Sequence, residues 1–164
     1  MAREPRAYES IMASASVYIH HTTPANPIHG EVNTTLASRG FYKLQIYPFV
    51  LVSNDDAVNQ LALFDHINRN SSYALFINGQ SYGNISSVNL IVAHSWVDGT
   101  SSWVGVEDRL QFSDKSSNIV VELITSEKPE VKLVYDIDVN LAGVTAVDCL
   151  VYMSVRGALV ITAH

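Results

Sequence analysis

The residues with the strongest capacity for ligand contact surround one polar turn. Trp96 and Trp103 flank the segment Asp98-Gly99-Thr100-Ser101, which places both indoles near the same end of a sheet. Two tryptophans beside a polar tip form a surface that stacks on sugars or docks a protein partner. Trp96, Asp98, Trp103 and Tyr82 are therefore our ligand or interface candidates. The competing interpretation is that the two tryptophans close one end of the core.

One stretch matches a catalytic motif by letter. Gly79-Gln80-Ser81-Tyr82-Gly83 reads G-x-S-x-G, the nucleophile elbow of α/β-hydrolases. That elbow requires a strand before the serine and a helix after it. A further strand is expected after this stretch, and an Asn-Gly hairpin would contain these glycines in any case. The sequence therefore predicts no catalytic residue and no enzyme.

The histidines do not form a convincing metal site. His20 and His21 are adjacent on an expected strand, so their side chains point to opposite faces, and only a loop residue such as His29 could join one of them. Asp136 and Asp138 share the wet face of another strand, about 7 Å apart, which would suit a glycosidase pair or a calcium site. Solvated acids are the commoner explanation. We predict no metal and no cofactor.

The element that dominates the chain is the stretch 131–141. Its odd positions carry Val131, Leu133 and Tyr135, continued by Ile137, Val139 and Leu141, and its even positions are mostly polar. A period of two over this length indicates a strand with one buried and one wet face. Parallel strands bury both faces, so the pattern favours an antiparallel sheet.

Similar patterns predict strands along most of the chain, at about 11–20, 32–36, 41–52, 73–77, 87–97, 103–112, 119–125, 131–141, 147–155 and 158–162. Pro48 lacks a backbone N–H and predicts an edge position or a bulge in the strand 41–52. One helix is expected at about residues 55–67, capped by Asn54 or Asp55. Arg156-Gly157 predicts a break before the last strand.

These elements predict an all-β fold: an antiparallel β-sandwich, jelly-roll-like, of about nine strands with the one short helix. Residues 1–10 are expected to form a polar leader and residues 11–164 a single domain. Cys149 lies in an apolar strand, where a buried, inert thiol is expected.

Composition limits the function classes. Charged residues make up only 16% of the chain and hydrophobic residues 48%, which favours a surface covered by copies of the chain or by a partner. The net charge of −6 and the lack of a basic arm argue against direct nucleic-acid binding. The charged N-terminus predicts no signal peptide, and no apolar run reaches the ~20 residues of a membrane span. If the structural interpretation holds, the protein resides in a virion or the cytoplasm.

Two functions remain. The first is a non-enzymatic, self-assembling structural protein, such as a jelly-roll viral capsid, virion or tail-type subunit acting through protein–protein interfaces in a homo-oligomer or larger assembly. The sequence pattern looks like that of single-jelly-roll capsid proteins. The alternative is a lectin-like carbohydrate-binding or adhesion module, whose partner would be a glycan. Here the pattern is similar to that of the trimeric tumour-necrosis-factor-like jelly rolls.

Overall fold

The protein is built mostly of β-strands, with one short helix. The computed structural model describes residues 7–36, 40–54, 56, 58–85, 88–94, 111–112, 119–125 and 128–161. Within these residues the elements are β1 (Ala7–His21), β2 (Ile28–Thr35), β3 (Gly40–Asn54), α1 (Gln60–Asn70), β4 (Ser72–Ile77), β5 (Gln80–Ile85), β6 (Asn89–His94), β7 (Gln111–Phe112), β8 (Ile119–Thr125), β9 (Glu130–Ile137) and β10 (Val147–Ile161). The predicted all-β class and single short helix are confirmed.

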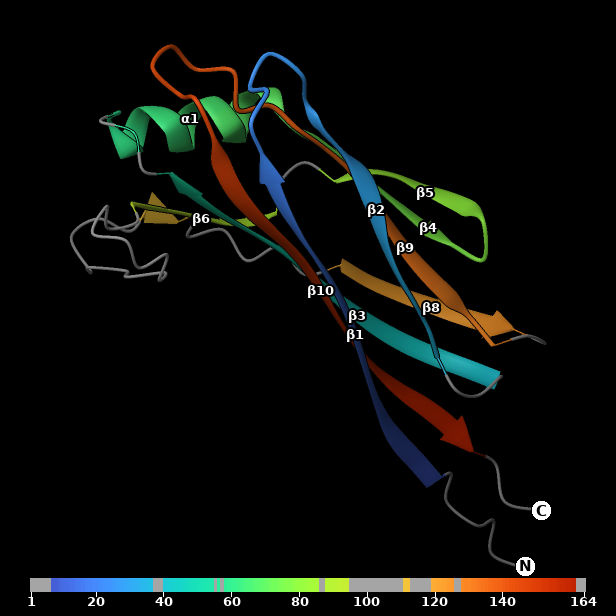
Figure 1. Ribbon diagram of the computed structural model, residues 1–164. Helices are drawn as coiled ribbons and strands as arrows, with labels where there is room; N and C mark the ends of the chain where they lie inside the picture. Colours follow the sequence, from blue (N-terminus) through green and yellow to red (C-terminus); the bar gives the residue numbers. More distant parts are fainter. Residues whose placement is uncertain are drawn as a thin grey trace, which may run out of the picture.

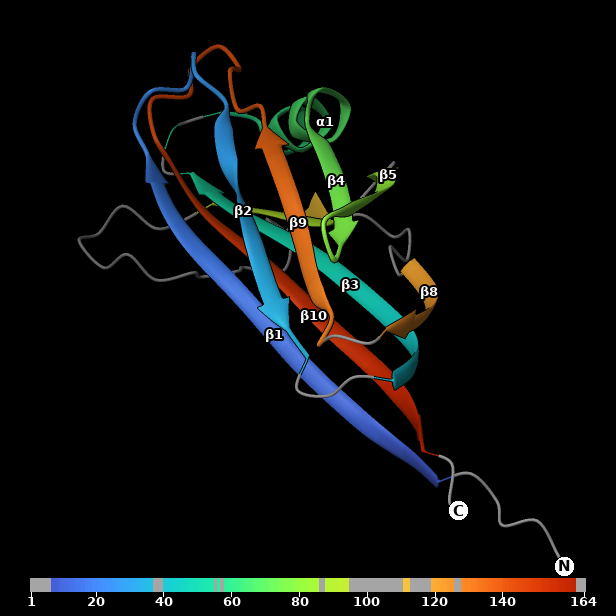
Figure 2. The ribbon, with the colours of Figure 1, turned by 90° about the vertical axis from the view of Figure 1, so that its right-hand side faces the viewer.

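The strands form two sheets that enclose one hydrophobic core. The larger sheet has the order β1-β10-β3-β6-β7, with β8 also paired to β3, and the smaller sheet has the order β2-β9-β4-β5. Buried side chains of both sheets belong to the same core cluster. Figures 1 and 2 show the long strands β1, β10 and β3 continuing past the smaller sheet at the end away from α1.

The antiparallel pairings are nested along the chain. β1 pairs with β10, β2 with β9, β3 with β8 and β4 with β5. The innermost pair is a hairpin whose turn residues, Asn78 and Gly79, have φ values of 53° and 78°. Positive φ at both positions is the requirement of a type I′ turn, which is why an Asn-Gly pair stands there. The chain therefore folds back on itself at the turn between β4 and β5, and the strand pairs that result are divided between the two sheets.

The alternation predicted for 131–141 is confirmed by the burial of β9, but the strand is shorter than expected: β9 runs from Glu130 to Ile137, and residues 138–141 belong to the loop that follows. Val131, Leu133, Tyr135 and Ile137 are buried, while the residues between them are partly exposed. β9 lies between β2 and β4, so its apolar side faces the core from the middle of the smaller sheet. The two-residue period determines this orientation because successive side chains leave a strand on opposite faces.

The prediction that Pro48 marks an edge or a bulge is wrong, because β3 is an interior strand. One side of β3 pairs with β10 along its length, and Pro48 lies opposite Met153 in that ladder. On the other side, β3 pairs antiparallel with β8 up to Ile46 and parallel with β6 from Phe49 onward. Pro48 therefore occupies the gap between the two partners, where a missing N–H breaks no ladder.

The last strand is not broken at Arg156-Gly157. β10 runs unbroken from Val147 to Ile161, and Gly157 lies opposite Ile11 of β1 and Leu44 of β3. Pairing on both sides holds the glycine in the sheet, which overrides its weak strand preference. β1 likewise begins at Ala7 rather than Ile11, because its ladder with β10 continues to Ile161.

The helix begins later than predicted. Its N-cap is Asn59, whose Oδ1 accepts a hydrogen bond from the backbone N–H of Ala62 at 3.0 Å, and it ends at Asn70. Asn54 is instead buried at the end of β3, and Asp55 lies outside the described residues. Leu63 and Ile67 are buried, and α1 lies across one end of the two sheets (Figure 1).

Three further expectations on the strands change. The hairpin partner of β4 is Gln80–Ile85, which no periodic signal marked, so the described residues hold ten strands rather than about nine. Of the expected strand 87–97, the structure describes residues 88–94, of which β6 occupies Asn89–His94. Of the expected strand 103–112, only residues 111–112 lie in the part that the structure describes.

Candidate interaction surface

The outer face of the larger sheet carries a group of large, partly exposed side chains. Tyr18 on β1 is 59% exposed and Tyr152 on β10 is 36% exposed. Four residues that lie beside them in the paired strands, on the same face, are also partly exposed. We call these six residues the aromatic face: Tyr18, Tyr47, Phe49, Leu51, Leu150 and Tyr152. These residues alternate along β1, β10 and β3 with residues that face the core, so the aromatic face lies on the side of the larger sheet turned away from the smaller sheet.

Aromatic neighbours hold a charged residue at each end of this face. At the end near α1, Asp148 Oδ1 accepts a hydrogen bond from the Tyr18 hydroxyl at 2.6 Å and lies 2.6 Å from His20 Nδ1. The bond to Asp148 is the main reason why the pKa of Tyr18 is raised above 10.0. At the opposite end, the guanidinium of Arg156 lies 5.8 Å from the centroid of the Tyr47 ring, within cation–π range.

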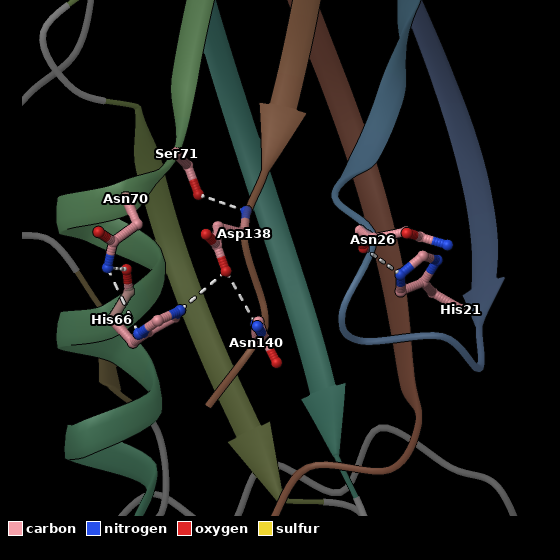
Figure 3. Close-up of polar contacts among 7 residues, drawn as sticks. All are labelled: His21, Asn26, His66, Asn70, Ser71, Asp138 and Asn140. Carbon is pink, nitrogen blue, oxygen red and sulfur yellow. Dashed lines mark hydrogen bonds and ion pairs between the residues drawn. The ribbon is translucent and has the colours of Figure 1, made fainter. Parts of the chain in front are cut away.

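A second polar cluster connects α1 to the loop after β9 (Figure 3). His66 Nε2 lies 2.8 Å from Asp138 Oδ1, and Asn70 Nδ2 lies 3.3 Å from the other ring nitrogen. An amide donor at Nδ1 leaves the proton of a neutral imidazole on Nε2, so His66 donates to Asp138. The backbone N–H of Asp138 donates to Ser71 Oγ, and its side chain accepts from the N–H of Asn140. The cluster ties the helix to the smaller sheet.

The pKa of Asp138 reflects these contacts. Burial alone would raise it, but the hydrogen bonds from His66 and from the Asn140 backbone, with the charge of His66, lower the pKa below 3.8. A lowered pKa in the folded state means stabilisation that is present above the unfolded pKa and lost as the pH falls through the folded value. The cluster therefore contributes to stability at neutral pH and stops contributing in acid.

We expect Asp138→Asn to lower the free energy of unfolding at pH 7 by about 1 kcal/mol, a modest value because the carboxylate is 37% exposed. The difference from wild type should vanish in acid, below the folded pKa. Urea unfolding at a series of pH values measures this. Asp136→Asn is the matched control, since Asp136 is 45% exposed and its nearest imidazole, His29, is 3.7 Å away. An equal pH dependence in both variants would contradict the assignment.

Asp56 lies in the segment between β3 and α1, before the helix N-cap Asn59. Its two carboxylate oxygens accept hydrogen bonds from the backbone N–H and the hydroxyl of Thr145, at 2.7 and 2.9 Å. Buried Asn54 donates both to Asp56 and to the carbonyl of Ala146. Partial burial opposes ionisation, yet these bonds lower the pKa of Asp56. The contacts fasten the segment after β3 to the loop before β10.

The histidines disperse rather than converge. His20 contacts Asp148, His21 Nε2 contacts the carbonyl oxygen of Asn26 at 2.7 Å, and His29 faces Asp136. The described residues contain no group of three or more His, Cys, Asp or Glu side chains arranged for a metal ion. Asp136 and Asp138, which share a strand face in the sequence pattern, each interact with a different histidine.

Of the four residues that the sequence proposed for ligand contact, the structure describes one. Tyr82 lies in β5 and is 43% exposed, on the hairpin away from the aromatic face. Trp96, Asp98 and Trp103 fall outside the described residues, so their convergence stays a prediction. Within the part of the chain that the structure describes, Tyr82 supplies an exposed ring on an edge strand of the smaller sheet.

Ser81 occupies a hairpin rather than a nucleophile elbow. It is the second residue of β5, and its Oγ accepts a hydrogen bond from the backbone N–H of Gly83 at 3.1 Å. Gly83 has a φ of 87°, and the ladder between β4 and β5 shifts register in this region. The two glycines of the motif thus serve a turn and an irregular strand, and β5 follows the serine where an elbow requires a helix.

Sequence reasoning missed Tyr18, Asp148, Tyr152 and Arg156. The signal is present in the sequence, because alternate residues of β10 are polar or aromatic between the buried valines. The register with β1 adds Tyr18 beside Leu150, and no local pattern could supply that pairing.

No protein-family model matches the chain, and no curated protein matches it either. Among the described residues, no helix combines the length and apolar character needed to cross a membrane.

Proposed function

We propose that this chain is a non-enzymatic, self-assembling structural subunit built on a jelly roll, of the type used in viral capsids, virions and tail-type assemblies. The observation that carries the proposal is the aromatic face: partly exposed apolar and aromatic side chains spread over three long neighbouring strands. An exposed patch of this kind is typical of a protein–protein interface.

The nested pairings support the jelly-roll form. Eight strands form the ladders β1–β10, β2–β9, β3–β8 and β4–β5, and they divide into two four-stranded layers, β1-β10-β3-β8 and β2-β9-β4-β5. A jelly roll likewise contains eight strands in two sheets. β6 and β7 come between β5 and β8 in the chain and extend the larger sheet, which accounts for the ten strands.

Composition supports assembly over catalysis or nucleic-acid binding. The chain has 16 acidic and 10 basic residues among 164, so little charge is available to keep copies apart or to neutralise phosphates. The polar contacts described above join one element to another, which is a structural use of these side chains. A protein that assembles through its outer surfaces does not need polar side chains that converge on one site.

Light scattering coupled to size-exclusion chromatography tests the proposal. We expect a mass above the 18.0 kDa of one chain, rising with protein concentration, and rings, shells or tubes by negative-stain microscopy. A monomer at every concentration would contradict self-assembly. The exposed Tyr82 favours the lectin-like alternative. A monomer that is retained on a glycan matrix, and whose Tyr82→Ala variant is not retained, would support that alternative.

A further inference from the structure

We propose that the aromatic face binds the same face of a second copy, through a two-fold axis that passes beside Tyr152 and runs across the strands. The inference rests on the proposed self-assembly and names the surface and geometry that would carry it. Its partner is this chain itself, and its two charged contacts join Asp148 of one copy to Arg156 of the other.

The outer side of β10 is arranged symmetrically about Tyr152. Along this side the residues are Asp148, Leu150, Tyr152, Ser154 and Arg156, so a negative and a positive residue stand four positions before and after the tyrosine. With a strand rise of about 3.4 Å, each charge lies about 14 Å from Tyr152. A two-fold rotation beside Tyr152 reverses the strand direction, so that position 148 of one copy faces position 156 of the other.

Charge selects this orientation over its alternative. A two-fold axis parallel to the strands would place Asp148 opposite Asp148 and Arg156 opposite Arg156, and both contacts would be repulsive. An axis across the strands places each Asp148 opposite an Arg156. The sequence of the paired strands provides no Lys, Arg, Asp or Glu on this side between those two rows, so no other charge opposes the arrangement.

Side-chain size fits the same orientation. The strand register places Tyr18 beside Leu150, and Ser14 beside Ser154. On β1 and β10, reversal about Tyr152 therefore sets Tyr18 and Leu150 against Ser14 and Ser154, so that large side chains meet small ones as the facing sheets interdigitate at about 10 Å. On β3, Leu51 meets Tyr47, and Phe49 meets its own copy beside the axis.

Both charged groups are held in place before any partner arrives. Asp148 is fixed by the Tyr18 hydroxyl and His20, and Arg156 is held over the ring of Tyr47. Fixed side chains lose less freedom on binding, which favours association. His20 and Tyr18 both contact Asp148 at the acidic end, so all variants are compared at a single pH of 8.

The experiment is a charge exchange followed by sedimentation velocity. Asp148→Arg alone and Arg156→Asp alone should each raise the dissociation constant at least tenfold, because each creates like-charged contacts. An equimolar mixture of the two variants should associate again, since both contacts between unlike chains then join an arginine to an aspartate. The double variant, which carries Asp148→Arg and Arg156→Asp in one chain, should also recover association.

Two matched controls reverse charge on the smaller sheet. Glu31→Lys and Lys132→Glu alter a pair with 3.8 Å between charged atoms on β2 and β9, and they should leave association unchanged. Recovery in the mixture cannot come from a misfolded variant, so it separates the interface from a folding defect. High salt should weaken the wild-type association.

The outcomes distinguish the interface from the proposed function. If the wild type assembles but neither charge reversal weakens it, or the mixture fails to recover, the aromatic face is not the interface and self-assembly stands. If the wild type is a monomer at every concentration, the proposed function fails and this interface with it. If Glu31→Lys and Lys132→Glu weaken association as strongly, general charge effects explain the result and the specific contact is overturned.

Discussion

Leu133→Ala is expected to lower the free energy of unfolding by about 2–5 kcal/mol, because it removes buried methyl groups and leaves a cavity that the surrounding side chains only partly fill. Leu133 is fully buried in the centre of β9, opposite Val32 of β2 and Leu75 of β4, and both of these partners are buried as well. The total free energy of unfolding of a protein is typically about 5–15 kcal/mol, so this loss is a large fraction of it. The melting temperature should fall by roughly 5–20 °C.

The matched control is Leu61→Ala on α1. Leu61 is 52% exposed, and alanine favours a helix at least as well as leucine, so the change should lie within about 0.5 kcal/mol of wild type. Chemical denaturation of both variants measures the difference. Equal stabilities would show that β9 does not lie at the centre of the core.

The second large effect concerns the reactivity of Cys149. Burial raises the pKa of this thiol to about 12 from a usual value of 9.0, and the side chain is fully buried on β10. The thiolate is the reactive form, so at any pH near 8 its fraction is about a thousandfold lower than in the unfolded chain. We therefore expect native protein to react with a thiol reagent at least a thousandfold more slowly than protein in denaturant.

A control places a thiol on an exposed strand position of the smaller sheet, away from the aromatic face. In a Cys149→Ala background, Asn33→Cys puts the sulfur on the exposed side of β2 and should react at the rate of a free thiol. Rapid labelling of native wild-type protein would mean that β10 is shifted by one residue, since such a slip turns every side chain to the opposite face. The measurement therefore tests the register on which the aromatic face depends.

Many local features followed from residue patterns alone. The alternation in β9 predicted which side chains are buried, and Asn78-Gly79 predicted a hairpin turn. The apolar surroundings of Cys149 predicted its burial. Each of these depends on interactions between residues close in the chain or on the two faces of a single strand, and such information is present in a short window of sequence.

Errors occurred where the outcome depended on a distant strand. Pro48 predicts an edge when β3 is considered alone, but β3 has β10 on one side and two successive partners on the other. Arg156-Gly157 predicts a break, but ladders on both sides hold that segment extended. Asn54 appeared to be a helix cap, whereas its side chain bonds Ala146, 92 residues later.

The amino-acid sequence by itself determined the β-rich class, the turn of the central hairpin and the side of each long strand that faces the core. Only the tertiary structure decided which strands are neighbours, and with them the clusters of Tyr18, His20 and Asp148 and of His66 and Asp138. The physical reason is that side-chain alternation specifies a face but not a partner. Backbone N–H and C=O groups are the same at every residue, so strand order emerges from how all the layers pack together.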